Sequence, residues 1–235
     1  KYEMISLEKK YSFLYSANSP SNSVGFKPSK NFQKYKHKVQ MLSLSNAFNR
    51  DDLVNFEKKI LNYLNKKIEL EYSVEPKIDG ISASLFYKDG KLLRGLSRGD
   101  GNEGEDITQN LKTIADIPHI IKKKNFPKEI DIRGEVFIKN SDFKKLSNKF
   151  ANPRNAASGS LRQKDSEQTK KIPLNFIAYT FGYEKNLEIK TQSEYLKNLK
   201  IWGFKINPLN RTLSGVKNLI TNYKEVEKNR KKLDF

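Results

Sequence analysis

The chain has 235 residues, with 45 lysines and arginines against 27 aspartates and glutamates, so its formal net charge at pH 7 is +18. The absence of cysteine excludes disulfides and zinc sites built on thiolates, and no apolar run approaches the roughly 18 residues that cross a bilayer. We therefore expect a cytoplasmic protein, away from membranes, with an acidic partner such as nucleic acid. Alternatively, the positive charge reflects a lysine-rich composition spread over solvated helix faces, without a binding role.

The N-terminal quarter predicts two helices around a loop. A short helical piece is expected from Lys1 to about Leu14, followed by a serine-rich loop at residues 19–23. Asn49 can cap a longer helix. The predicted apolar stripe of that helix consists of Leu53, Phe56, Ile60, Leu61 and Leu64.

A lysine then stands at the end of a predicted strand. Residues 71–77 alternate polar and apolar side chains, which places Glu75 and Lys77 on one face. Pro76 should end the strand or lie at a sheet edge, and Gly80 lets the chain turn. A lysine beside carboxylates at such a place can serve as a covalent nucleophile once it is neutral. Taken alone, the pattern fits a solvated turn lysine better.

A hairpin follows directly. Ile81–Tyr87 and Lys91–Ser97 are β-prone runs, and Asp89-Gly90 between them predicts a two-residue turn with both residues at positive φ. Counting outward from the turn places Arg98 opposite Ile81. The glycine-rich acidic loop that follows, up to a helix expected near Ile107, can be either an ordinary surface loop or a nucleotide-facing one.

Strand Ile130–Ile138 carries Arg133 and Glu135 on one face. A carboxylate inside a strand is costly unless it has a partner. Glu135 therefore either binds a ligand group, such as a ribose hydroxyl or a metal-bound water, or forms a salt bridge with Arg133. Beyond this strand, Ser141 is expected to cap a short helix.

Asn152-Pro153 predicts a helix start, with Asn as the cap and Pro as the first helical residue. Arg154, Ser158 and Arg162 would then form one stripe of the helix, either to hold phosphate or as a solvated face. Gly159 weakens the prediction of a continuous helix.

The last third predicts a strand at Leu174–Phe181, in which Tyr179 is more often a core residue than a stacking platform. Thr191 and Glu194 form a capping box for a helix that ends at Gly203. A final helix carries Val216, Leu219, Ile220, Tyr223 and Val226. We expect Trp202 in the core and structural roles for His37 and His119. Together, the elements predict an α+β class with antiparallel sheets.

Five segments resemble the adenylation domain of bacterial NAD-dependent DNA ligases. They are HKVQMLSLSNAF at 37–48, EPKIDG at 75–80, SRGDGNEGEDIT at 97–108, RGEVF at 133–137 and FANPRNAASGSLRQ at 150–163. The resemblance runs from about Ser19 to Phe235. It implies a nucleotidyltransferase (ATP-grasp-like ligase adenylation) fold, with antiparallel sheets flanked by helices.

The resemblance also implies roles for individual residues. Lys77 is the catalytic nucleophile, which takes AMP from NAD and passes it to the 5′-phosphate of nicked double-stranded DNA during replication and repair. The implied nucleotide-binding residues are Ser43, Leu44, Glu75, Arg98, Glu135 and Tyr179, with Tyr179 stacking on the purine. Arg154, Arg162 and Arg230 face phosphates. Mg²⁺ is expected to act with the substrate, and no residue is assigned to it as a ligand.

The resemblance further implies two segments. Residues 1–30 correspond to the remnant of an N-terminal nicotinamide-mononucleotide-binding subdomain and its linker. Residues 31–235 correspond to an adenylation domain that is incomplete at its C-terminus, so the chain is expected to be an incomplete ligase and a monomer. Two alternatives stay open: an ATP- or GTP-dependent nucleotidyltransferase acting on RNA ends, and a catalytically idle basic module that binds nucleic acid.

Overall fold

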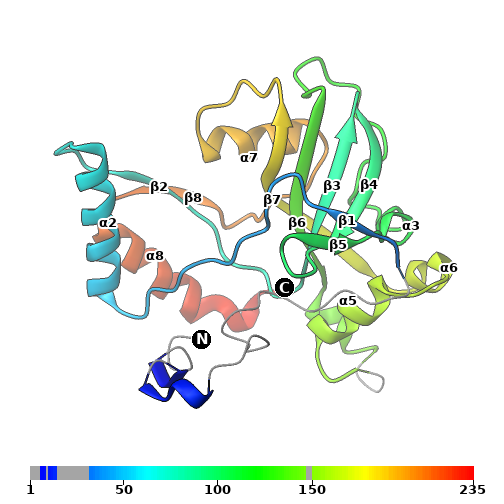
Figure 1. The fold of residues 1–235 in the computed structure, drawn as a ribbon, viewed down its shortest axis with the longest axis horizontal. Coiled ribbons are helices and arrows are strands. Elements are labelled where there is room, and N and C mark those ends of the chain that lie inside the picture. The colour runs from blue at the N-terminus through cyan, green and yellow to red at the C-terminus, as the bar shows by residue number, and fades with distance from the viewer. Residues whose placement is uncertain (1–5, 9, 15–31, 147–149) are drawn as a thin grey trace.

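The computed structural model describes residues 6–8, 10–14, 32–146 and 150–235 (Figure 1). Within this part of the chain, one four-stranded sheet has the order β4-β3-β6-β7, and two-stranded sheets pair β1 with β5 and β2 with β8. Every pairing is antiparallel. The predicted α+β class with antiparallel sheets is therefore confirmed.

The elements have the following bounds. The strands are β1 Lys34–Lys36, β2 Glu71–Val74, β3 Ile81–Lys88, β4 Lys91–Ser97, β5 Glu103–Glu105, β6 Glu129–Ile138, β7 Leu174–Lys185 and β8 Arg211–Ser214. The helices are α2 Arg50–Leu64, α3 Thr108–Leu111, α4 Asn140–Phe143, α5 Pro153–Leu161, α6 Ser166–Lys170, α7 Gln192–Ile201 and α8 Gly215–Asn229, with 3-10 turns η1 Ser12–Leu14 and η2 Arg230–Lys232. None of the described helices is long and apolar enough to cross a membrane.

The hairpin turn forms as predicted, but its register does not. Asp89 and Gly90 have φ of 47° and 73°, and Lys88 pairs with Lys91. A bulge then shifts the register, because Tyr87 pairs with Leu92 whereas Phe86 pairs with Arg94. The extra residue on β4 moves the remaining pairs by one position. The ladder ends at Ala83 and Ser97, so Arg98 does not lie opposite Ile81.

The strand predicted at residues 71–77 is shorter and belongs to another sheet. It ends at Val74, before Pro76, and pairs with β8. Together with α2 and α8, this two-stranded sheet lies to one side of the four-stranded sheet (Figure 1). The segment from Glu75 to Gly80 therefore connects two sheets. It is not the end of one long strand.

Local capping signals were more reliable than strand ends. Asn49 caps α2, Asn152 caps α5 and Thr191 caps α7, each by accepting a backbone N–H. Ser141 does not cap α4. Lys139 occupies the N-cap position without a side-chain capping bond, and the Ser141 hydroxyl donates to Asp234 at 2.7 Å. Strand β7 runs four residues past the predicted end at Phe181.

An aromatic cluster fills the space between the four-stranded sheet and α7. Tyr87, Phe126, Trp202 and Phe204 meet largely edge to face, with ring centroids 5.0 to 5.9 Å apart. Trp202 is buried, as predicted. The two histidines bond backbone carbonyls, His37 that of Arg98 and His119 that of Lys112, which agrees with structural roles. The predicted loop at residues 19–23 lies outside the described residues.

Gly134 and Gly159 give a matched test of packing on β6 and α5. A Cβ at Gly134 would collide with the Phe176 ring and the Ile177 carbonyl, whereas one at Gly159 would meet only Phe150, at 3.5 Å. We expect Gly134→Ala to destabilise the fold by about 1–3 kcal/mol. Gly159→Ala should leave stability unchanged or raise it by up to about 1 kcal/mol, because alanine favours helix. Urea unfolding midpoints check both values, and equal midpoints for the two variants would contradict this packing.

Candidate active site

Lys77 is an exposed side chain in a segment whose Ile78 and Gly80 are buried. Ile78 packs with Phe137 and Ile177 in a small apolar cluster. Gly80 lies so close to β6 that a Cβ there would meet the Val136 carbonyl and, at 2.9 Å, the Glu135 side chain. The backbone on the C-terminal side of Lys77 is therefore fixed against the four-stranded sheet, while its amine stays accessible to a ligand.

Glu135 is the buried carboxylate of this site. It lies opposite Ser82 in the β3–β6 ladder, and its Oε2 accepts the Ser82 hydroxyl at 2.9 Å. Burial raises the pKa of Glu135, while the Ser82 hydrogen bond and the charges of Lys77 and Arg154 act in the opposite direction. Lys77, Glu135 and Arg154 are therefore close enough to interact electrostatically.

The alternative partner for Glu135, a salt bridge to Arg133, does not form. The Arg133 guanidinium donates to the carbonyls of Val39 and Gln40 instead. The two side chains do share a face of β6, as predicted, but the β6–β7 register shifts between Arg133 and Gly134. Each charged group thus has its own set of partners.

Tyr179 and Glu75 meet through a residue that the sequence did not single out. Gln192, at the start of α7, donates its side-chain N–H groups to Glu75 Oε1 at 2.8 Å and to the Tyr179 carbonyl at 2.6 Å. The Tyr179 side chain interacts with Ser82 and with the charge of Glu135, and burial raises its pKa. The capping box had located the backbone of Gln192, but no sequence signal indicated where its side chain points.

Arg98 and Ser43 also come together. The segment 34–43, here called the strap, lies along the loop that follows β4, with hydrogen bonds from His37 to Asn102 and from Met41 to Gly101. At its end, Ser43 accepts a hydrogen bond of 3.1 Å from Arg98. Within the described residues, the buried Nε of Arg98 has no hydrogen-bond partner. Leu44, the next residue along, is 76% exposed.

The two arginines of α5 do not form the common stripe that was predicted. Arg154 binds Asp79, two residues after Lys77 in sequence, at 2.9 Å. Arg162 lies just past the end of the helix, where its Nε binds Glu105 at 3.0 Å. The helix stops at Leu161, so the third member of the stripe turns to a different partner. Arg230 begins the exposed turn η2, beyond α8.

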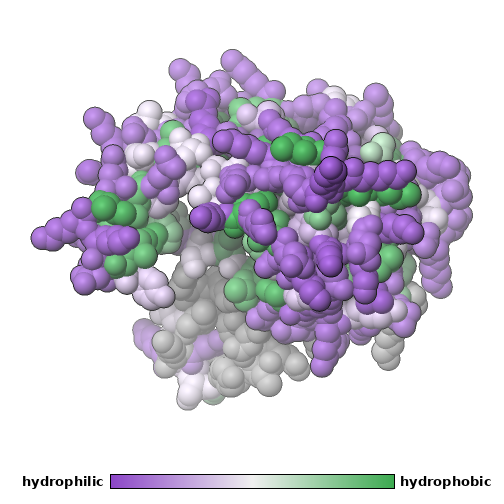
Figure 2. Space-filling view, turned by 90° about the horizontal axis from the view of Figure 1, so that it is seen from above, coloured by the Kyte–Doolittle hydropathy of each residue, from purple (hydrophilic) through white to green (hydrophobic). Residues whose placement is uncertain are grey.

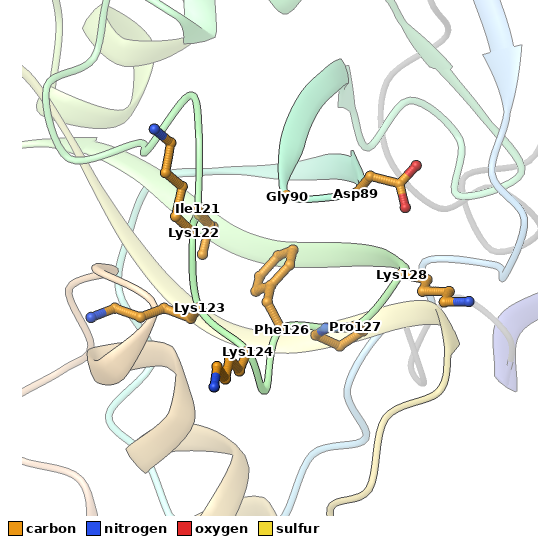
Figure 3. Close-up of a pocket in the computed structure, with 9 residues that line it drawn as sticks. All are labelled: Asp89, Gly90, Ile121, Lys122, Lys123, Lys124, Phe126, Pro127 and Lys128. Carbon is orange, nitrogen blue, oxygen red and sulfur yellow. The ribbon is translucent and has the colours of Figure 1, made fainter.

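The hollow drawn in Figure 3 is not part of this site. It measures about 300 Å³ and lies at the Asp89-Gly90 turn, roughly 23 Å along β3 from the Lys77 end. The side chains of Lys122, Lys123 and Lys124 point away from one another in Figure 3. In the described ranges, no three histidine, aspartate or glutamate side chains are grouped as a metal site.

Comparison with known proteins identifies the family of the chain. Residues 29–235 match the family model of the NAD-dependent DNA ligase adenylation domain. The chain belongs to this family.

Relatives named DNA ligase extend the match. The chain is 70% identical to the DNA ligase of Pelagibacter ubique, over all of this chain and 35% of that protein. It is 46% identical to the DNA ligase of Parvibaculum lavamentivorans, over 97% of this chain and 34% of that protein. It is 42% identical to the DNA ligase of Xanthobacter autotrophicus, over 100% of this chain and 34% of that protein. This adenylation-domain chain thus spans about one third of the length of these relatives.

The ionised form of Glu135 should lower the free energy of unfolding of the adenylation domain. Because burial raises its pKa above that of the unfolded chain, the native state holds the proton more tightly, and stability falls as pH rises through the two values. We expect Glu135→Gln to be more stable than wild type by about 1 kcal/mol at pH 8, with the gap closing in acid.

Glu129→Gln on the same strand is the matched control for that measurement. Hydrogen bonds and ion pairs with Lys38 and Lys88 lower the pKa of Glu129, so its contribution is present at neutral pH and lost as pH falls. The two substitutions should shift the thermal midpoint in opposite directions at pH 8. Shifts of the same sign would contradict the assignment.

Arg154→Ala and Arg162→Ala should separate in stability. Arg154 and Asp79 are exposed, so losing their pair should change unfolding free energy by less than about 0.5 kcal/mol. Glu105 is fully buried, so removing Arg162 should cost about 2–4 kcal/mol. Denaturant titration measures both. A small loss for Arg162→Ala would show that its contact with Glu105 is not structural.

Proposed function

We propose that Lys77 is the nucleophile of a nucleotidyl transfer. Its neutral amine attacks the adenylyl phosphorus of NAD, a P–O bond breaks, nicotinamide mononucleotide leaves, and the amine proton is released as a phosphoramidate forms. A 5′-phosphate oxygen of nicked DNA then displaces the lysine. Finally the 3′-hydroxyl attacks the adenylated end and AMP leaves. The observation that carries the proposal is an accessible lysine beside a buried carboxylate and an arginine, in a chain of this family.

The proposed nucleotide-binding residues come from five segments of the chain. Glu75 and Tyr179 would receive the adenine, the first by hydrogen bonding and the second by stacking. Glu135 would bind the ribose. Arg98 would reach the nucleotide together with Ser43 and Leu44, and its unpartnered Nε supports that role, because such a donor suits an anionic ligand.

The arginines are proposed to face phosphates to different degrees. Arg154 is the most direct candidate, since it already lies at the Lys77 site through Asp79. Arg162 would face phosphate while its Nε stays on Glu105, and Arg230 would do so from the exposed turn after α8.

Magnesium is proposed to act with the substrate. Mg²⁺ in such sites is usually held by one or two carboxylates plus substrate phosphates, and no residue of this chain is assigned to it as a ligand. When bound, it would neutralise charge that develops at phosphorus. The residues of this chain would hold and orient the nucleotide around it.

Other expectations stay within the same proposal. They are a nucleotidyltransferase fold, a division at residues 1–30 and 31–235, cytoplasmic location, a monomeric state and a role in replication and repair. The alternatives, an RNA-directed ATP- or GTP-dependent transferase and an idle basic module, are not favoured by the family match.

Adenylylation of Lys77 can be tested in a chimaera in which this chain replaces the matching part of the Pelagibacter ubique DNA ligase. With adenine-labelled NAD, we expect a labelled protein that Lys77→Arg reduces by at least roughly 100-fold, because arginine does not deprotonate usefully. Lys91→Arg, at the distant hairpin turn, is the control and should label normally.

Labelled ATP and GTP serve as competing substrates in the same assay. Labelling from either of them in preference to NAD would contradict the assignment of NAD as the substrate. A persistent adduct in Lys77→Arg would contradict the assignment of Lys77 as the nucleophile.

A further inference from the structure

The Gln192 side chain connects two residues of the proposed nucleotide pocket. Its Nε2 donates to Glu75 Oε1 at 2.8 Å and to the Tyr179 carbonyl at 2.6 Å. Glu75 follows β2 of the small sheet, whereas Tyr179 lies in β7 of the four-stranded sheet. The Gln192 carboxamide therefore holds the Glu75 side chain close to the Tyr179 backbone, although the two residues belong to segments of different sheets.

The backbone of Gln192 is itself held firmly. Thr191 caps α7 by accepting the Glu194 N–H at 3.2 Å, and Glu194 accepts the Lys190 N–H at 3.1 Å. Tyr195, fully buried one turn further on, donates its hydroxyl to the Thr180 carbonyl in β7. The first turn of α7 is thus bound to β7 beside Tyr179, so the direction of the Gln192 side chain is set by capping and packing.

The recorded hydrogen bonds to the Glu75 carboxylate all reach the same oxygen. Gln192 and the Ser73 hydroxyl, at 3.2 Å, both donate to Oε1. Among the residues that the structure describes, none is recorded as donating a hydrogen bond to Oε2. Burial raises the pKa of Glu75, and the donors from Gln192 and Ser73 act against this shift. The two donors therefore occupy one oxygen of the carboxylate and leave the other available to a ligand.

We propose that Gln192 is a positioning residue for base specificity, which turns Glu75 Oε2 toward the exocyclic amino group of adenine. The inference rests on the proposed function, in which Glu75 meets the adenine. An amino group donates to a carboxylate, whereas the 6-oxo group of hypoxanthine or guanine is an acceptor and is repelled. Without Gln192, the carboxylate can rotate or protonate, and the distinction between the bases weakens.

The test is equilibrium binding of AMP and IMP to this 235-residue chain by titration calorimetry. IMP differs from AMP in carrying an oxo group in place of the amino group. We expect wild type to prefer AMP by about tenfold or more and Gln192→Leu to prefer it by less than about threefold, mainly through weaker AMP binding. Gln168→Leu, which removes an exposed glutamine that donates to Asp165 from α6, should behave as wild type.

Gln192→Glu tests the role through the pH dependence of AMP affinity, which should not change if Gln192 only stabilises the fold. It places a second carboxyl against Glu75, so AMP binding should weaken as pH rises from about 5 to 8 and recover in acid, where the new carboxyl takes up a proton and donates. Wild type should not show this steep dependence.

Each result bears on a different claim. Equal losses of AMP and IMP affinity in Gln192→Leu would overturn the specificity role, as would retained discrimination. Failure of wild type to bind AMP, or to distinguish it from IMP, would overturn the placement of Glu75 against adenine and this inference with it. Lys77 adenylylation in the chimaera is scored separately, so the proposed function can survive the loss of this inference.

Discussion

The structure depends on a row of charges buried in its central strand. Asp131, Arg133 and Glu135 alternate along one face of β6, and each is less than 8% exposed. Burying ionised groups is costly unless each finds partners. Asp131 and Arg133 attract each other, and each has further partners: Asp131 the Tyr183 backbone, and Arg133 the strap carbonyls. Glu135 interacts with Ser82, Lys77 and Arg154.

These partners explain why remote segments converge here. Arg133 needs acceptors, and the carbonyls of Val39 and Gln40 bring the strap to β6, which in turn delivers Ser43 to Arg98. Gly182 on β7 has no side chain because the Arg133 guanidinium occupies the space where its Cβ would lie. The partners of one buried charge therefore position Ser43 in the candidate nucleotide pocket, although Ser43 lies more than 30 residues before Lys77 in the sequence.

Local signals could be predicted from the sequence, and contacts between distant segments could not. Asp89-Gly90 and the caps at Asn49, Asn152 and Thr191 depend on a few neighbouring residues, and all formed. The β4 bulge could not be predicted, since alternation alone does not reveal an inserted residue. The bond of Arg162 to Glu105 and the reach of Gln192 to Glu75 depend on where other elements pack, across 57 and 117 residues. The motifs located the site, but not which side chains in it bond one another.

The partners of Glu129 change how the net charge of +18 should be understood. Lys38 and Lys88 share this one carboxylate, and Lys38 also lies over the rings of Phe86 and Tyr183 at 4.2 and 4.0 Å. Figure 2 shows hydrophilic side chains over much of the face it presents. Counterions condensed on a polyanion are released only where a cation neutralises one of its phosphates, so a lysine that stays paired with Glu129 releases none. The slope of log affinity against log salt should therefore count only the lysines and arginines that reach phosphates, fewer than the 45 in the sequence.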